Sequence, residues 1–333
     1  MADTAHYQTD LKLEEMEKRL SAIYSRAEKT VQKKMAEYAK SIDEKSAELL
    51  QAYKDAETED EKRKAKKAYI RFYRKLVKSK EFVSLSATVA DDLYKANVKA
   101  SAYINSQTSS IYALNYNWTN AELEKEIDGF IPLTVTEKEA AQYGNLTAQE
   151  IDKKKDIDWN KQNLQKSILA GSLLLLGANK IMKRSAKVTV KKNQNSANSH
   201  IIDMGGDAET KGRYDSLRRS EAMGNTHTKI WRTAGDNRVR DSHAKIDGEE
   251  VDLYNKFSNG LKRPKDPDGR PEEIYNCRCT ILWGGYGGRS ATRSARQGTV
   301  TGSYKDPRSF KNTQSIEVAN MPYKELMEWL MNQ

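Results

Sequence analysis

The fold class is decided by residues 13–42, LEEMEKRLSAIYSRAEKTVQKKMAEYAKSI. Apolar residues recur here every three or four positions, which puts them in one stripe along a helix, with Lys and Glu on the opposite side. The stripe consists of Leu13, Met16, Leu20, Ile23, Ala27, Val31, Met35, Tyr38 and Ile42. A stripe this narrow needs a partner, either another helix of the same chain or a neighbouring subunit. This first half of the chain is predicted to be helical, and because no Gly or Pro occurs between Met1 and Gly129, the breaks between helices must come from capping chemistry.

Three capping boxes predict later helix starts, because in each a Thr hydroxyl can accept from a free amide while a Glu reaches back. They pair Thr119 with Glu122, Thr136 with Glu139, and Thr147 with Glu150. Another helix is predicted over residues 159–183. The polar segment 188–212 contains Gly205 and Gly206 and is predicted to be a loop or hinge. A helix over residues 213–223 follows.

The composition argues against one large globule. Hydrophobic residues make up 37% of the 333 residues and charged residues 31%, which suits narrow helix stripes better than a broad core. The N-terminus lacks the basic and apolar regions of a secretory signal. The apolar run within residues 168–182 is about half of the ~20 residues that a membrane span needs, so no membrane partner is expected. Cys277 and Cys279 cannot form a disulfide framework and fit reduced thiols in a cytoplasm.

The net charge of +10 favours an anionic partner. Residues 62–80 contain ten basic residues and no acidic one, and on a helix their aromatic residues would pack inward and leave the charges outside. Such an array is sufficient for non-specific, salt-dependent contact with DNA phosphates. The alternative is a solvated helix surface. The tail over residues 289–311 and the segment 183–192 could add to the array. The candidate DNA-binding residues are Lys62, Arg63, Lys64, Lys66, Lys67, Arg71, Arg74, Lys75, Arg293 and Arg296.

The most informative stretch is residues 228–283, TKIWRTAGDNRVRDSHAKIDGEEVDLYNKFSNGLKRPKDPDGRPEEIYNCRCTILW. Strands are predicted over residues 229–234, 249–253 and 275–283, with a helix over 237–246 that Asp236 caps. His243 would then point toward the core, with Cys277 and Cys279 on one face of the last strand and Arg278 on the other. These elements predict a small α+β unit of roughly sixty residues. A flexible basic tail and a short helix over residues 321–331 follow.

Three interpretations of this stretch compete. His243, Cys277 and Cys279 could bind zinc, although Cys-x-Cys is not the usual spacing and His227 or Asp236 would have to supply a fourth ligand. Asp236 or Asp241 could form an acid–base pair with His243, as in a nuclease, but no nucleophile motif or carboxylate cluster accompanies them. The third interpretation is a structural scaffold with small thiols packed on a buried histidine. The residues alone favour the scaffold, without a cofactor.

Ten residues of this stretch form a specific combination. They are Trp231, Asp236, Arg238, Arg240, His243, Gly248, Asn276, Cys277, Arg278 and Cys279. Together with the Pro-rich loop before Pro271 and Glu272, their order resembles the Mu-F-like minor head protein family of tailed bacteriophages. The resemblance is tight over residues 229–283 and extends loosely back to Trp159.

The resemblance implies a structural, non-enzymatic minor component of the phage head. Such a protein is made in the host cytoplasm and incorporated into the virion at few copies near the portal vertex. Its partners would be the portal protein, other head proteins and, non-specifically, DNA, in procapsid assembly and in DNA packaging or delivery. The alternative from a different class is a zinc-containing enzyme that processes nucleic acid.

The predicted organisation is mainly α, with an elongated helical N-terminal region before a small α+β C-terminal domain. Residues 1–158 form a helical arm and residues 159–226 a helical linker region. Residues 227–285 form the small Mu-F-like domain, and residues 286–333 a basic tail with a short C-terminal helix. The one-sided stripe of the arm would suit docking onto a portal or scaffold partner, or bundling within the chain.

Overall fold

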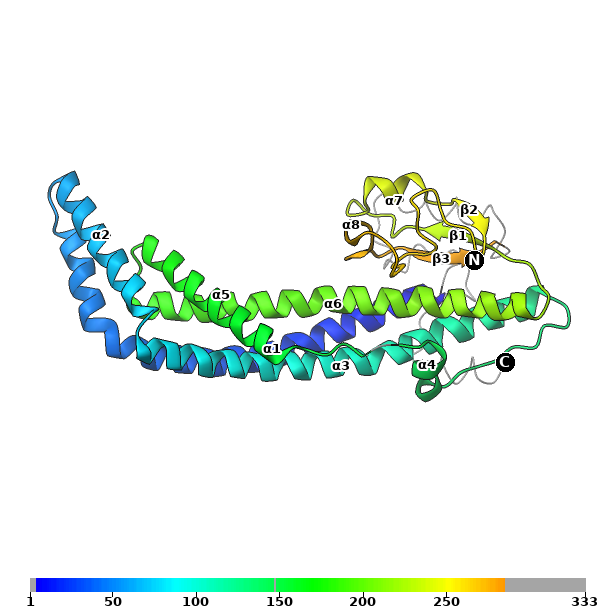
Figure 1. The fold of residues 1–333 in the computed structure, drawn as a ribbon, viewed down its shortest axis with the longest axis horizontal. Coiled ribbons are helices and arrows are strands. Elements are labelled where there is room, and N and C mark those ends of the chain that lie inside the picture. Colours follow the sequence, from blue (N-terminus) through cyan, green and yellow to red (C-terminus); the bar gives the residue numbers. More distant parts are fainter. Residues whose placement is uncertain (1–3, 147, 285–333) are drawn as a thin grey trace. The chain divides into compact units, whose positions relative to one another are not determined.

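The computed structural model describes residues 4–146 and 148–284, which are mainly α-helical with a small α+β part near the C-terminal end (Figure 1). This confirms the predicted fold class. The helices are α1 (Thr4–Lys54), α2 (Glu59–Leu76), α3 (Lys80–Glu126), α4 (Glu137–Tyr143), α5 (Lys153–Leu173), α6 (Ala178–Ala222), α7 (Asp241–Lys245) and α8 (Pro271–Ile274). The strands are β1 (Thr228–Arg232), β2 (Glu250–Asp252) and β3 (Thr280–Trp283).

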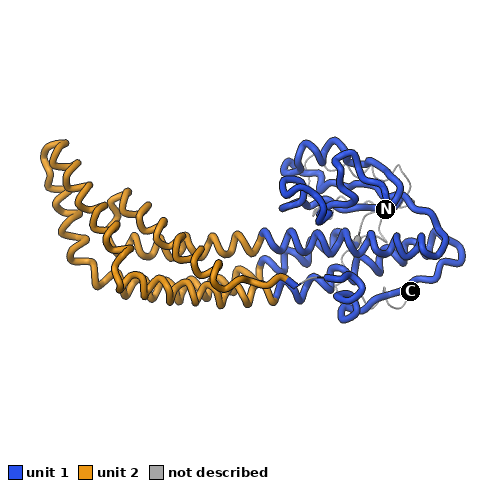
Figure 2. The backbone as a smooth tube through the Cα atoms, in the orientation of Figure 1, with its two compact units in different colours: residues 1–17, 103–148, 199–333 blue, residues 18–102, 149–198 orange. Residues whose placement is uncertain are grey.

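The chain divides into two compact units, drawn in blue and orange in Figure 2. Unit 1 contains residues 1–17, 103–148 and 199–333, and unit 2 contains residues 18–102 and 149–198. The units therefore interleave along the sequence, whereas the predicted domains follow one another. Helices α1, α3 and α6 each contribute residues to both units.

Unit 2 buries the stripe predicted for residues 13–42 against helices of the same chain. Leu20, Val31 and Met35 are fully buried. The Tyr24 hydroxyl donates to Asn97 Oδ1 of α3 at 2.8 Å, and the Tyr38 ring lies 5.9 Å from that of Phe82. The stripe thus finds its partner within the chain, which is the bundling alternative.

The segment 188–212, predicted to be a loop or hinge, lies entirely inside α6, so that prediction was wrong. Some of its polar residues, among them Thr189, Asn193 and Thr210, are buried in the structure. In unit 2 Asn193 Nδ2 donates to Asn160 Oδ1 at 2.7 Å, while Asn193 Oδ1 accepts from Asn97 Nδ2 at 2.7 Å. Asn97 also donates to Asp156 at 2.8 Å. Buried amides that satisfy one another remove the cost that polar residues would otherwise have inside a helix bundle.

The glycines of the same segment allow close helix packing in unit 1. A Cβ added at Gly205 would lie 2.4 Å from Leu13 Cδ2, and one at Gly212 would lie 2.6 Å from the backbone oxygen of Tyr112. Because helices cannot approach this closely through a side chain, these glycines serve helix contact. They do not mark a hinge.

Capping chemistry predicted one of the helix starts correctly. Thr136 and Glu139 form a capping box at α4. Thr119 does not cap a helix, because it lies inside α3 and donates to the backbone oxygen of Asn115 at 2.9 Å. Thr147 lies outside the described residues. A further box, at Thr58 and Glu61, begins α2.

The helix predicted over residues 159–183 is two helices. Asp152 caps the first, α5, through the Lys155 amide at 3.0 Å. The chain then breaks between Leu173 and Ala178, where α6 begins.

The α+β part of unit 1, residues 228–284, is called the sheet domain below. Its strands have the order β2-β1-β3 and are antiparallel, with Ile230 opposite Leu282 and Trp231 opposite Ile281. Both faces of the sheet are buried. One face packs with α3 and α6 through Leu123 and Leu217, and the other covers a second core that contains Trp231, Ile246, Phe257, Leu261, Cys277, Cys279 and Ile281.

The elements of the sheet domain are shorter than predicted. The helix expected over residues 237–246 begins only at Asp241, with Arg240 at the N-cap position. Asp236 therefore does not cap that helix, and instead accepts from the Arg238 amide at 3.0 Å in the preceding turn. The last strand begins at Thr280 and not at Tyr275, because residues 275–279 form an irregular segment that brings the two cysteines toward α7.

Candidate functional site

His243 and the two cysteines come together inside the sheet domain. His243 lies on α7, and Cys277 and Cys279 lie just before β3. The distance from His243 Nδ1 to Cys279 Sγ is 3.4 Å and to Cys277 Sγ 3.6 Å. Their ligand atoms all lie within 4.8 Å of one another. All three residues are buried, so the thiols face the imidazole and not solvent.

A carboxylate on the far side of the ring fixes the orientation of His243. Its Nε2 lies 2.9 Å from Oε2 of Glu273, which belongs to α8 and also accepts from Ser242 Oγ at 3.0 Å. An ionised Glu273 accepts the Nε2 proton, and Nδ1 lies on the side of the ring that faces the thiols. The Trp231 ring meets the imidazole edge-on, with centroids 5.0 Å apart, and restricts its rotation further.

The pKa values of the two thiols are shifted in opposite directions. A hydrogen bond from Cys279 lowers the pKa of the Cys277 thiol, with a smaller contribution from His243. The pKa of Cys279 is raised, because its thiol donates to Cys277 and is buried. The backbone amide of Cys279 also donates to Cys277 Sγ at 3.4 Å. Cys277 therefore loses its proton more readily than Cys279.

The other polar residues of the motif bind the surrounding loops to one another. Arg278 donates to Asp236 Oδ1 at 2.6 Å, and this ion pair lowers the pKa of the Asp236 carboxyl. Arg240 donates to the backbone oxygen of Tyr275. Asn276 has a φ of 54°, and its amide donates to Asp203 of α6 at 2.6 Å.

Two further motif residues have different surroundings. Gly248 has a φ of 83°, a left-handed conformation that favours glycine, and its amide donates to the Trp231 carbonyl at 2.8 Å. The Arg238 side chain is 75% exposed and lies 3.6 Å from Asp236. Its side chain is therefore available to a partner.

The residues that the sequence suggested as a fourth metal ligand, or as catalytic partners of His243, do not lie in this cluster. His227 Nε2 lies 2.6 Å from Ser220 Oγ, and Asp236 is paired with Arg278. The group of possible metal ligands found among the described residues contains neither. Asp241 is exposed at the start of α7, whereas the carboxylate that contacts His243 belongs to Glu273.

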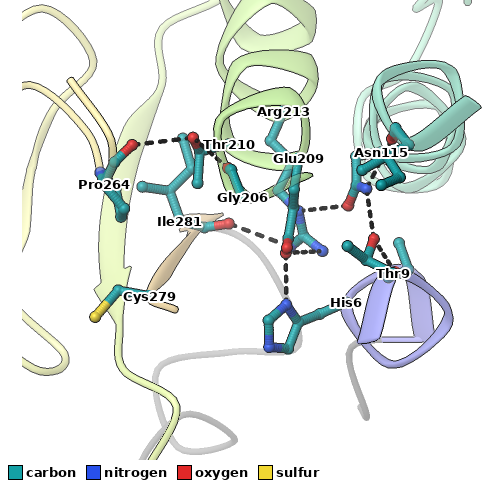
Figure 3. A network of polar contacts seen from close by, with 12 residues as sticks. His6, Thr9, Asn115, Gly206, Glu209, Thr210, Arg213, Pro264, Cys279 and Ile281 are labelled. Carbon is teal, nitrogen blue, oxygen red and sulfur yellow. Dashed lines mark hydrogen bonds and ion pairs between the residues drawn. The ribbon is translucent and has the colours of Figure 1, made fainter. Parts of the chain in front are cut away.

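A second buried site, which the sequence analysis missed, anchors the N-terminal end of the chain to the sheet domain within unit 1 (Figure 3). Arg213 on α6 donates to Asn115 of α3 at 2.9 Å and to the backbone oxygen of Ile281 at 3.2 Å. Its neighbour Glu209 accepts from His6 of α1, 2.6 Å away. His6 and Glu209 are 203 residues apart, so no local pattern could have revealed this network.

The predicted DNA-binding residues of α2 fall into two groups. Lys62, Arg63 and Lys64 form ion pairs with Glu59 or Asp60, at 2.5–3.2 Å. The other five candidates of this helix are exposed: Lys66, Lys67, Arg71, Arg74 and Lys75. The aromatic residues Tyr69 and Tyr73 are fully buried, as expected for packing inside unit 2. Arg293 and Arg296 lie outside the described residues.

Comparison with known families covers the sheet domain and the helices before it. Residues 161–282 match the sequence model of the family described as phage Mu protein F like protein. This segment is Mu F-like. The match begins in α5 and ends in β3, so it includes all ten motif residues named above.

The family match supports a phage head morphogenesis protein. Comparisons with curated proteins and with solved structures found no match. Within the described part of the chain, none of the helices has the length and apolar character needed to span a bilayer.

Proposed function

We propose that this protein is a minor component of the phage head that acts at the portal vertex during procapsid assembly and DNA packaging or delivery. The match of residues 161–282 to the Mu protein F-like family carries the proposal. In the proposed role the protein is made in the host cytoplasm and enters the virion, where it contacts the portal and other head proteins. Its contribution is structural and not catalytic.

The distribution of charge supports a DNA contact in unit 2. Its 135 residues contain 32 Lys and Arg and 17 Asp and Glu, a formal net charge of +15. The remaining residues contain 25 basic and 30 acidic side chains, a net charge of −5. All the excess positive charge of the chain thus belongs to one unit, which is the arrangement that attracts a polyanion.

Exposed basic residues of α6 extend the candidate surface beyond α2. Residues 178–198 contain six basic residues and no acidic one, and all six are exposed: Lys180, Lys183, Arg184, Lys187, Lys191 and Lys192. Most of them recur at the three- or four-residue spacing that makes one side of a helix. We assign non-specific phosphate contact to this side of α6 together with the exposed basic residues of α2.

Co-purification with the portal protein of the same phage tests the assembly role. The full chain would be co-expressed with tagged portal protein. The complex would be purified by the tag on the portal protein, and its mass would be measured by native mass spectrometry. We expect a stable complex with fewer copies of this chain than of portal.

Two controls make a negative result informative. Circular dichroism must show that the chain is helical, and electron microscopy must show that the portal has formed rings. If both hold and no complex forms, and if the chain is also missing from purified heads, the proposed role is wrong. Nucleic-acid turnover by the purified chain would support the enzymatic alternative instead.

A further inference from the structure

We propose that His243 Nδ1, Cys277 Sγ and Cys279 Sγ bind one zinc ion in the sheet domain. A water molecule would complete a tetrahedral site, because the described residues supply three donors. The inference rests on the geometry of these side chains and does not depend on a role at the portal.

The spacing of the donors fits a tetrahedral metal. Zinc bonds are about 2.3 Å to sulfur and about 2.0 Å to nitrogen, so tetrahedral angles separate a bound sulfur from a bound nitrogen by roughly 3.6 Å. The observed Nδ1–Sγ separations are 3.4 and 3.6 Å. Both nitrogen–sulfur separations therefore already suit a tetrahedral ion, and all three donor atoms lie within 4.8 Å of one another.

Hydrogen bonding alone explains this arrangement less well. A Cys279 thiol that donates to Cys277 has no proton left for Nδ1, yet the Cys279 sulfur lies closer to Nδ1 than the Cys277 sulfur does. A cation placed among the three atoms satisfies all of them at once. Two thiolates and an imidazole also form a soft donor set that suits zinc better than calcium or magnesium.

Glu273 completes the arrangement typical of zinc sites. A histidine that ligates a metal through one nitrogen usually donates the other N–H to a carboxylate, which fixes the ring. His243 Nε2 lies 2.9 Å from Glu273 Oε2, on the side of the ring away from the cysteines. Both partners belong to short elements, α7 of five residues and α8 of four, which have little stability of their own. A bound ion would connect α7 to the segment before β3.

Metal analysis of the untagged full chain tests the proposal. The protein would be expressed with added zinc, freed of its affinity tag, desalted, and measured by inductively coupled plasma mass spectrometry. We expect one zinc per chain. Replacing zinc with Co(II) should give the intense visible bands of a tetrahedral ion and near-ultraviolet thiolate charge-transfer absorption.

Variants separate the ligands from their neighbours. Cys279→Ser and His243→Gln should lose the ion, while Glu273→Gln should keep the stoichiometry but weaken affinity roughly 10- to 100-fold. His200→Gln, which changes a histidine of α6 outside the cluster, should bind zinc as the unchanged chain does. If the ligand variants do not fold, the Co(II) titration of the unchanged chain still decides the question. A folded chain without stoichiometric zinc and without cobalt–thiolate bands would overturn the proposal.

Discussion

Unit 2 and the sheet domain of unit 1 use the same kinds of residues for opposite purposes. Unit 2 carries its net charge of +15 on exposed helix surfaces, where the position of each Lys or Arg matters little for folding. In the sheet domain Arg240 and Arg278 each bond a specific oxygen, of Tyr275 and Asp236 respectively, that holds a loop in place. The first arrangement depends on the amount of charge, and the second on the identity of each side chain.

The contrast explains where a family pattern can be recognised. A phosphate-binding surface keeps its function through many substitutions, provided that enough positive charge remains. A small domain with short strands needs particular contacts to fold at all. The Mu F-like match over residues 161–282 includes every motif residue of the sheet domain and leaves out α2, although it also covers α5 from Lys161 and the unit 2 part of α6.

The largest effect is expected from Trp231→Ala. Trp231 is fully buried in β1, with its ring 5.0 Å from that of His243 and 5.1 Å from that of Phe257. Removing a buried aromatic side chain costs about 3–5 kcal/mol. Urea unfolding followed by circular dichroism should show that loss of stability.

Trp159→Ala is the matched control, because Trp159 lies in unit 2 and is 41% exposed. Its effect should stay within about 0.5 kcal/mol. Equal losses in the two variants would contradict the assignment of the tryptophans to different environments.

The next effect is expected from Gly212→Ala. Alanine normally stabilises a helix interior by about 1 kcal/mol relative to glycine. Here the added methyl group would lie 2.6 Å from the backbone oxygen of Tyr112, so one helix must move and we expect a net loss of about 1–3 kcal/mol. Gly177→Ala, at the position before α6 in unit 2, is a control for the clash alone, since nothing lies within 4 Å of its added Cβ and its effect should stay below about 1 kcal/mol. Thermal unfolding measures the stability of both variants. A higher melting temperature for both would contradict the prediction.

The periodicity of apolar residues predicted the helices that bury an apolar face. The stripe from Leu13 to Ile42 gave α1 in this way. Periodicity did not predict the helix over residues 188–212, because α6 buries polar residues there, among them Thr189, Asn193 and Thr210. Local composition cannot distinguish buried, mutually bonded polar side chains from those of a loop, because their partners lie far away in the sequence.

The candidate site was predictable only in part. Helical spacing placed His243 inward, and strand alternation placed Cys277 and Cys279 on one side, although β3 begins after both cysteines. Glu273 was missed, because thirty residues of loop and strand separate it from His243. Its contact depends on how the Pro-rich loop folds back, and no short pattern encodes that.

A smaller effect, on binding instead of stability, is expected when charge is removed from α2. The variant Lys66→Gln, Lys67→Gln, Arg71→Gln should bind duplex DNA more weakly, and the slope of log Kd against log salt should fall by about one for each phosphate that the protein no longer neutralises. Fluorescence anisotropy at several salt concentrations would measure this for two unrelated sequences, which should respond alike.

The neighbouring triple variant Lys62→Gln, Arg63→Gln, Lys64→Gln removes the same charge from the same helix. It should have less effect, because these three side chains already pair with Glu59 or Asp60. An unchanged slope in both variants would remove α2 from the proposed DNA surface and leave α6 to be tested.

The smallest effect is expected from Asp236→Asn, and it should depend on pH. The ion pair with Arg278 lowers the pKa of Asp236 below the ordinary value of 3.8, so folding favours the ionised carboxylate. That contribution is complete above the ordinary pKa and is lost as the pH falls through the lower pKa of the folded state. We expect the variant to lose about 1 kcal/mol near neutral pH, since the amide can keep part of the hydrogen bonding.

The pH dependence distinguishes this ion pair from simple packing. Urea unfolding of the two proteins between neutral and strongly acidic pH should show their difference in stability shrinking only below about pH 4. Asp268→Asn, at an exposed position in the Pro-rich loop, should show no such change. A constant difference at every pH would mean that Asp236 acts through its shape and its bond to the Arg238 amide, and that the charge of Arg278 is needed for something other than holding this loop.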